Sequence, residues 1–258
     1  DLFGLKENTM SAHLAMRSGN PALTAETFSG FPTVADDQVM TITGTVNKTI
    51  VSLLILLITA SYVWGRGPSD PYFMVFTMVG VFGGLVVAIA TAFKQTWAPL
   101  TTPLYAGLEG LALGGISVGF EAAYPGIVSQ AVFLTFGTLG ALLMAYRSGM
   151  IRATENFKLG VVAATGGIGL VYLLSFVLGF VGINVPLIHS SGTFGILFSV
   201  FVVVVAALNL VLDFDFIEQG AERRAPKYME WYGAFGLLVT LVWLYLEILR
   251  LLAKLRDR

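Results

Sequence analysis

Long apolar stretches, interrupted by short polar segments, fill the chain from residue 46 almost to its end. A membrane-spanning α-helix needs about 20 consecutive apolar residues, at a rise of about 1.5 Å each. Seven stretches have about this length: Val46–Trp64, Tyr72–Phe93, Pro99–Phe120, Ile127–Tyr146, Leu159–Val181, Thr193–Leu212 and Trp231–Leu252. Most connections between them are short and carry Gly or Pro, which favour turns. The pattern therefore predicts an all-α membrane protein with seven transmembrane helices, consecutive helices running antiparallel.

The composition agrees with a membrane protein and excludes several other classes. Hydrophobic residues make up 56% of the 258 residues and charged residues only 12%, whereas a soluble domain carries roughly 25% charged residues. The expected partner is the lipid bilayer, and a net charge of −1 gives no basic surface for a nucleic acid. With no cysteine and two histidines, we expect neither a resident metal nor another cofactor. His189-Ser190-Ser191 lacks a recognisable nucleophile motif, so we do not expect an enzyme.

Three regions follow from this pattern: a polar N-terminal tail at 1–45, a seven-helix transmembrane domain at 46–255 and a C-terminal tail at 256–258. Cytoplasmic loops carry an excess of Lys and Arg near the helix ends, and this excess sets the orientation of a membrane protein. With a cytoplasmic N-terminus, the inner side holds Lys48, Lys94, Arg147, Arg152, Lys158, Arg223, Arg224 and Lys227. The outer loops then hold only Arg66, so we predict this orientation. The basic residues from Arg250 to Arg258 disagree with it, which leaves the side of the C-terminus open.

Glycine is frequent, with 29 residues, and several glycines in the third apolar stretch are four residues apart. The pairs are Gly110/Gly114 and Gly115/Gly119. Small residues at this spacing let two helix backbones approach closely in lipid. We expect tight helix packing from them, and no phosphate-binding loop, because the basic residue of such a motif is missing.

Ionisable residues inside apolar stretches are the candidates for function, since each costs about 2.5–3.5 kcal/mol at the bilayer centre. Glu109 lies deep in the third stretch, where it either packs as a protonated side chain or lines an ion path. Asp213 and Asp215 follow the sixth stretch, and Asn209 shares a helix face with Asp213, four residues away. They are either interfacial residues of a helix end or part of a site.

Glu247 lies in the seventh stretch, three residues before Arg250. Residues at this spacing are neighbours on a helix, so a local ion pair between the two is one interpretation. The other is that Glu247 takes part in an ion path.

Three segments together resemble the Bax inhibitor-1 family, also called the transmembrane Bax inhibitor motif family, which includes bacterial YccA-like and YetJ-like proteins. Tyr105-Ala106-Gly107-Leu108-Glu109-Gly110 is similar to the aromatic, glycine-spaced third helix of the family. Asp213-Phe214-Asp215-Phe216-Ile217 is similar to the end of its sixth helix. Leu244-Tyr245-Leu246-Glu247-Ile248-Leu249-Arg250 is similar to the signature of its seventh helix. The resemblance covers the chain from about Val46 to Leu255.

The resemblance implies six helices in two layers of three around a central C-terminal helix, in the inner (plasma) membrane of a bacterium. It also implies a pH-sensitive calcium leak gated by an acidic pair, which by motif is Asp213 and Glu247. These two carboxylates would line a transient Ca²⁺ path, and Lys94 matches a basic residue that latches the sixth-helix acid in the family. Lys94, Glu109, Asn209, Asp215 and Arg250 are auxiliary candidates. Two departures from the pattern concern the pair: Glu stands for Asp at position 247, and Arg250 stands where Asn is common.

Two functions therefore compete at this point. The first is a proton-regulated cation leak, for which carboxylate and amide oxygens are suitable Ca²⁺ ligands. The second is a non-transporting accessory or structural subunit, or a regulator, of a larger membrane complex. Its N-terminal tail would dock on another membrane protein.

Overall fold

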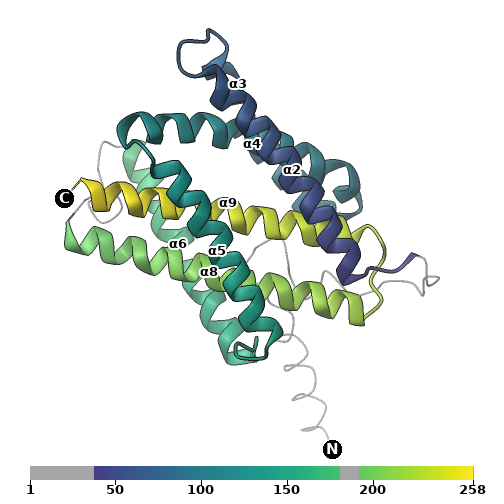
Figure 1. Ribbon diagram of the computed structural model, residues 1–258. Coiled ribbons are helices and arrows are strands. Elements are labelled where there is room, and N and C mark those ends of the chain that lie inside the picture. Colours follow the sequence, from purple (N-terminus) through teal and green to yellow (C-terminus); the bar gives the residue numbers. More distant parts are fainter. Residues whose placement is uncertain (1–37, 181–191, 258) are drawn as a thin grey trace, which may run out of the picture. The chain divides into compact units, whose positions relative to one another are not determined.

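The structure is a computed structural model that describes residues 38–180 and 192–257 (Figure 1). The predicted docking of the tail at residues 1–37 and the loop His189-Ser190-Ser191 lie outside the described residues. Within the described residues, seven α-helices follow one another: α2 (Ile42–Arg66), α3 (Phe73–Phe93), α4 (Ala98–Ala123), α5 (Ile127–Arg147), α6 (Glu155–Phe180), α8 (Thr193–Glu222) and α9 (Met229–Arg256). A short 3₁₀ helix, η3 (Gln95–Trp97), precedes α4.

Six of these helices are long and apolar enough to cross a membrane, which confirms the predicted all-α membrane fold. The helix outside this set is α4, which carries Glu109 and Glu121 among many small residues. In α9 the most apolar stretch is 67% buried, whereas the corresponding stretches of α2, α3, α5 and α6 are 11–22% buried. The high burial of α9 is compatible with a central C-terminal helix, and the two-layer arrangement around it stays a prediction.

Helix ends differ from the ends of the apolar stretches. Thr41 caps α2, because its side-chain oxygen accepts a hydrogen bond from the backbone N–H of Gly44. Gly67 ends the same helix with a φ of 65°, a backbone conformation that glycine adopts without strain. The larger difference is in α8, which continues to Glu222, so Asp213 and Asp215 lie inside a helix and not at its end.

The chain divides into two compact units. The α2–α4 unit comprises Gly30–Val128 and Ile217–Val239. The described part of the α5–α6 unit lies in Ser129–Phe216 and Thr240–Arg258. The long helices α8 and α9 therefore contribute one segment to each unit.

In the α2–α4 unit, α4 packs against both α2 and α3. A Cβ atom on Gly110 or Gly114 would meet the backbone of α2, and one on Gly115 would meet Thr77 of α3. The predicted close packing is therefore confirmed for these three glycines. Among the described residues nothing lies within 4 Å of a Cβ on Gly119, so close packing at this residue is not confirmed.

The segment just before α2 docks on the connection between α8 and α9. The backbone N–H of Met40 donates to the carbonyl of Ala225 at 2.6 Å, and the N–H of Lys227 donates to the carbonyl of Gln38 at 2.8 Å. Met40 is buried, at 1% exposure. Residues 38–40 thus belong to the folded α2–α4 unit.

Candidate functional site

A row of polar side chains on one face of α6 organises the α5–α6 unit. Lys158, Thr165 and Tyr172 are seven residues apart, and because seven residues make nearly two turns, they point in the same direction. Each has a polar partner on α8 or α9. We call this line of contacts between α6, α8 and α9 the polar seam.

One end of the seam contains Lys158, Thr165, Asn209, Asp213 and Asp215, which we call the aspartate group. The ammonium of Lys158 is 2.8 Å from a carboxylate oxygen of Asp215. The side-chain amide Nδ2 of Asn209 donates to the hydroxyl of Thr165 at 2.8 Å. Asp213 is fully buried, at 0% exposure. This end therefore holds two carboxylates and one ammonium inside the helix bundle.

Apolar side chains interrupt the seam beyond Thr165. Ile168 of α6 and Val202 and Val205 of α8 form a buried cluster, at 0–4% exposure, which we call the apolar plug. Trp243 of α9 packs against it. Thr165 and Tyr172, on either side of Ile168, are about 10 Å apart along the helix axis. An apolar segment of about this length separates the polar ends of the seam.

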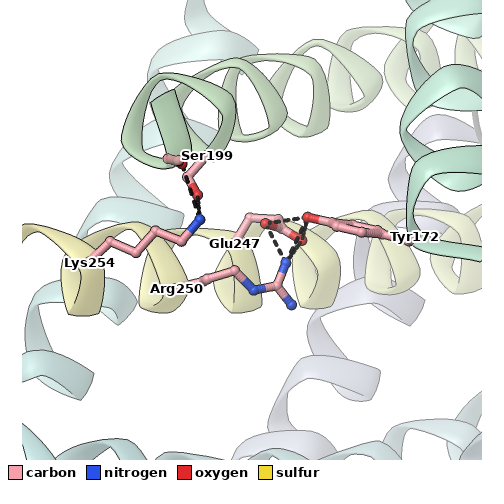
Figure 2. A network of polar contacts seen from close by, with 6 residues as sticks. Tyr172, Ser199, Glu247, Arg250 and Lys254 are labelled. Carbon is pink, nitrogen blue, oxygen red and sulfur yellow. Dashed lines mark hydrogen bonds and ion pairs between the residues drawn. The ribbon is translucent and has the colours of Figure 1, made fainter. Parts of the chain in front are cut away.

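The other end of the seam contains Tyr172, Ser199, Glu247, Arg250 and Lys254, the glutamate group (Figure 2). The hydroxyl of Tyr172 donates to both carboxylate oxygens of Glu247, at 3.0 and 3.1 Å. The guanidinium of Arg250 donates to the same oxygens at 2.7 and 2.9 Å, and to the Tyr172 hydroxyl at 2.7 Å. The local Glu247–Arg250 pair, one of the two interpretations of the sequence, is thus confirmed. It holds α9 to α6.

Lys254 is buried beside this pair, at 6% exposure, and its ammonium binds neutral groups of α8. It donates to the hydroxyl of Ser199 at 2.9 Å and to the carbonyl of Gly195 at 3.1 Å (Figure 2). Together with Arg250, it gives the glutamate group two cations for one carboxylate.

The two predicted gating acids, Asp213 and Glu247, belong to different ends of the seam. Along the helix axes, Asn209 lies at the same height as Thr165, to which it is hydrogen-bonded, and Glu247 lies at the same height as its partner Tyr172. Asp213 is one helical turn beyond Asn209, on the side away from Glu247. The two carboxylates are therefore about 16 Å apart along the helix axes. Their contact stays a prediction, which requires a different arrangement of α8 and α9.

The auxiliary candidates Lys94 and Glu109 lie in the α2–α4 unit. Lys94 follows α3 and is exposed, with its ammonium 4.5 Å from the centre of the Trp97 ring. Glu109 is half-buried in α4, hydrogen-bonded to Tyr105 one turn earlier and adjacent to Gly84 of α3. These contacts fit the packing interpretation of Glu109. The latch between Lys94 and Asp213 stays a prediction.

Sequence reasoning missed the α6 residues of the seam, and it missed Ser199 and Lys254 of the glutamate group. In the sequence, Lys158 only marks the predicted inner side of the membrane, and Thr165 and Tyr172 lie within an apolar stretch where neither is unusual. Their signal is the seven-residue spacing, which places three hydrogen-bonding side chains on one helix face. The same spacing links Glu247 and Lys254 on α9.

A comparison with protein-family models finds a match over residues 20–257 to the family described as Bax inhibitor 1 like. A search of curated proteins finds no match.

Proposed function

Because the chain belongs to the Bax inhibitor 1 like family, we propose that it is a proton-regulated cation leak whose cargo is Ca²⁺. We place it in the inner membrane of a bacterium with its N-terminus in the cytoplasm. The observation that carries the proposal is a buried polar seam of three helices interrupted by an apolar plug. Buried ionisable residues in a membrane helix need a reason, and an ion path is the usual one.

The plug fits the closed state of such a path. Hydrophobic constrictions gate channels because water leaves them and an ion cannot cross without its hydration shell. The polar groups on either side supply oxygen atoms, which suit a hard cation such as Ca²⁺. Opening then requires the plug residues to separate enough for water to enter.

Protons are proposed to act on Asp213 and Glu247. Protonation of Glu247 would remove the charge that holds Arg250 and Tyr172 and would loosen the link between α9 and α6. Protonation of Asp213 would lower the negative charge of the aspartate group. Either change alters the balance between closed and open packings, which commonly differ by a few kcal/mol.

The experiment is Ca²⁺ flux in liposomes reconstituted with the purified full chain, comparing Val205→Asn with Val204→Asn. Val205 is 4% exposed and lies in the plug, whereas its neighbour Val204 is 49% exposed and lies on the outer face of the same helix. A polar side chain in the plug should favour water there and raise flux about tenfold, equal to roughly 1.4 kcal/mol of barrier. The same substitution at Val204 should leave flux at the parent level. Equal effects of both substitutions, or no flux in any variant, would contradict the leak.

Absence of flux would instead favour the accessory-subunit alternative. A second arm measures flux in mildly acidic and mildly alkaline buffer for the parent, Asp213→Asn and Glu247→Gln. The proposal expects a pH dependence in the parent that both variants lose. If both keep it, the regulating proton binds elsewhere.

A further inference from the structure

Glu109 is an ionisable side chain near the middle of α4. It lies 11 residues after Ala98 and 14 residues before Ala123, which begin and end the helix. At about 1.5 Å per residue, it is about 16 and 21 Å from the two helix ends. In a helix that crosses the bilayer, as predicted for α4, this is far from water. An ionised carboxylate at such a depth needs a cation or several hydrogen-bond donors.

The described surroundings of Glu109 supply neither. Its carboxyl group is hydrogen-bonded to the hydroxyl of Tyr105, and no cation of the described chain pairs with it. The neighbouring helix α3 contains no ionisable residue. The ionisable residues of α2, which are Lys48, Tyr62 and Arg66, bind other partners. The carboxyl group therefore has one polar contact and no counter-charge within the α2–α4 unit.

The contacts of this carboxyl group suit its neutral form. The ring of Tyr105 packs edge-on against Phe235 of α9, with ring centres 5.1 Å apart, so the hydroxyl that meets Glu109 is held in place. On the other side, a Cβ atom on Gly84 of α3 would lie 3.0 Å from Oε2 of Glu109, so this oxygen faces an apolar backbone position. A carboxylate has two oxygens that both accept hydrogen bonds, whereas a protonated acid has fewer unmet acceptors.

We propose that Glu109 is a proton-binding site of the α2–α4 unit, whose carboxyl group holds its proton while α3 packs on α4. Loss of the proton places a negative charge against Gly84, on a helix that offers no donor, and α3 must then move to admit water. Proton uptake thus holds α3 on α4, and proton release loosens the two helices. The site does not depend on the proposed leak, because it uses none of the residues of the polar seam.

The first test is labelling of the detergent-purified full chain with dicyclohexylcarbodiimide, a reagent that dissolves in hydrocarbon and reacts with protonated carboxyl groups. The carboxyl oxygen bonds to the central carbon of the reagent and the proton goes to one of its nitrogens. The resulting O-acylisourea rearranges to a stable N-acylurea without loss of any atom, and mass spectrometry of peptides locates the label.

Glu121 is the matched control, because it lies on the same helix but has donors for both oxygens. Its carboxylate accepts from the backbone N–H groups of Gly126 and Val128, at 2.5 and 3.2 Å. We expect labelling of Glu109 to exceed that of Glu121 by about tenfold or more in neutral buffer, and to decrease as the pH rises. Equal labelling of the two residues, or labelling of Glu109 that does not change with pH, would overturn the site.

The coupling to α3 is tested with Gly84→Ala, and Gly83→Ala is the control. The new Cβ at position 84 meets the carboxyl group of Glu109, whereas the one at position 83 meets the flexible side chain of Leu108, at 3.2 Å. Gly84→Ala should displace the carboxyl group from α3 and shift its half-labelling to a lower pH. Gly83→Ala should label like the parent. The same half-labelling pH in both variants would overturn the coupling.

A comparison with Glu109→Gln decides the matter if Gly84→Ala does not fold. Glutamine has the shape of the protonated acid but no proton to lose. A native state that holds a proton more tightly than the unfolded chain loses stability as the pH rises. The variant should therefore melt at the same temperature as the parent in acidic buffer and at a higher temperature in alkaline buffer. A difference between the two that is the same at every pH would overturn the proposal.

Discussion

Glu230, at the start of α9, is the most thoroughly bonded buried carboxylate in the described part of the α2–α4 unit. It is 0% exposed. Its Oε1 accepts from the backbone N–H and the hydroxyl of Thr41, at 3.1 and 2.8 Å. The ammonium groups of Lys48 and Lys227 are 2.9 and 3.0 Å from its two oxygens. One side chain thus joins α9 to the start of α2.

We predict that Glu230→Ala lowers the free energy of unfolding by about 3 kcal/mol. Breaking a buried ion pair costs about 3–5 kcal/mol when the remaining charge stays buried. Here Lys48 and Lys227 are 26% and 44% exposed, so water can solvate them and the loss falls at the lower end. The remaining cost is the Thr41 N–H, a partly buried donor left without its acceptor. Lys227→Ala removes one exposed partner and should cost less than about 1 kcal/mol.

The assay is thermal unfolding of the detergent-solubilised full chain, followed by circular dichroism, for the parent and both variants. For a chain of this size, 1 kcal/mol corresponds to about 2–4 °C, so Glu230→Ala should melt roughly 6–12 °C below the parent. Lys227→Ala should stay within about 4 °C of it. Equal melting temperatures of the two variants would refute the reasoning, because Glu230 would then act as an ordinary surface charge.

Two further predictions concern packing and topology. Gly110→Ala should cost about 1–3 kcal/mol of unfolding free energy, because the new Cβ meets the backbone carbonyl of Leu56. Gly119→Ala, where no atom of the described residues lies within 4 Å of the new Cβ, should be neutral or stabilising by up to about 1 kcal/mol, and similar melting temperatures of the two would contradict this. For the topology, cysteines introduced at Gly67 and Arg152 should react with an impermeant thiol reagent from opposite sides of the membrane, as a cytoplasmic N-terminus requires. Labelling of both from one side would exclude that orientation.

The helices were predictable because an apolar run of sufficient length has few alternatives in a chain of this composition. The residues at which the helices begin and end were less predictable. The run ending at Leu212 marks where strongly apolar residues stop, but α8 continues through polar residues to Glu222. Hydropathy reports the environment of a segment, whereas backbone hydrogen bonds decide where a helix ends.

Local contacts were predictable where long-range ones were not. Glu247 and Arg250 are three residues apart, so helix geometry alone brings them together. The bond from Tyr172 to Glu247 joins residues 75 positions apart and depends on the register between α6 and α9. The spacing of polar and apolar residues shows which face of a helix packs against its neighbours. It does not show how far the helix is shifted along its axis relative to a neighbouring helix. For this reason the sequence also placed Asp213 and Glu247 together, although helix register now assigns them to different ends of the seam.

If the chain is the proposed leak, the charges of the two ends would explain how the closed seam resists ions. The aspartate group holds two carboxylates and one ammonium, so it attracts a cation, whereas the glutamate group holds one carboxylate and two cations and repels it. A cation that passes the apolar plug therefore meets Arg250 at the carboxylate it would need as its next ligand. Arg250 is 38% exposed and has room to move, whereas Glu247 is 3% exposed and does not. Under the proposed leak, opening thus takes two events, water entering the plug and Arg250 leaving Glu247, and proton uptake by Glu247 favours the second.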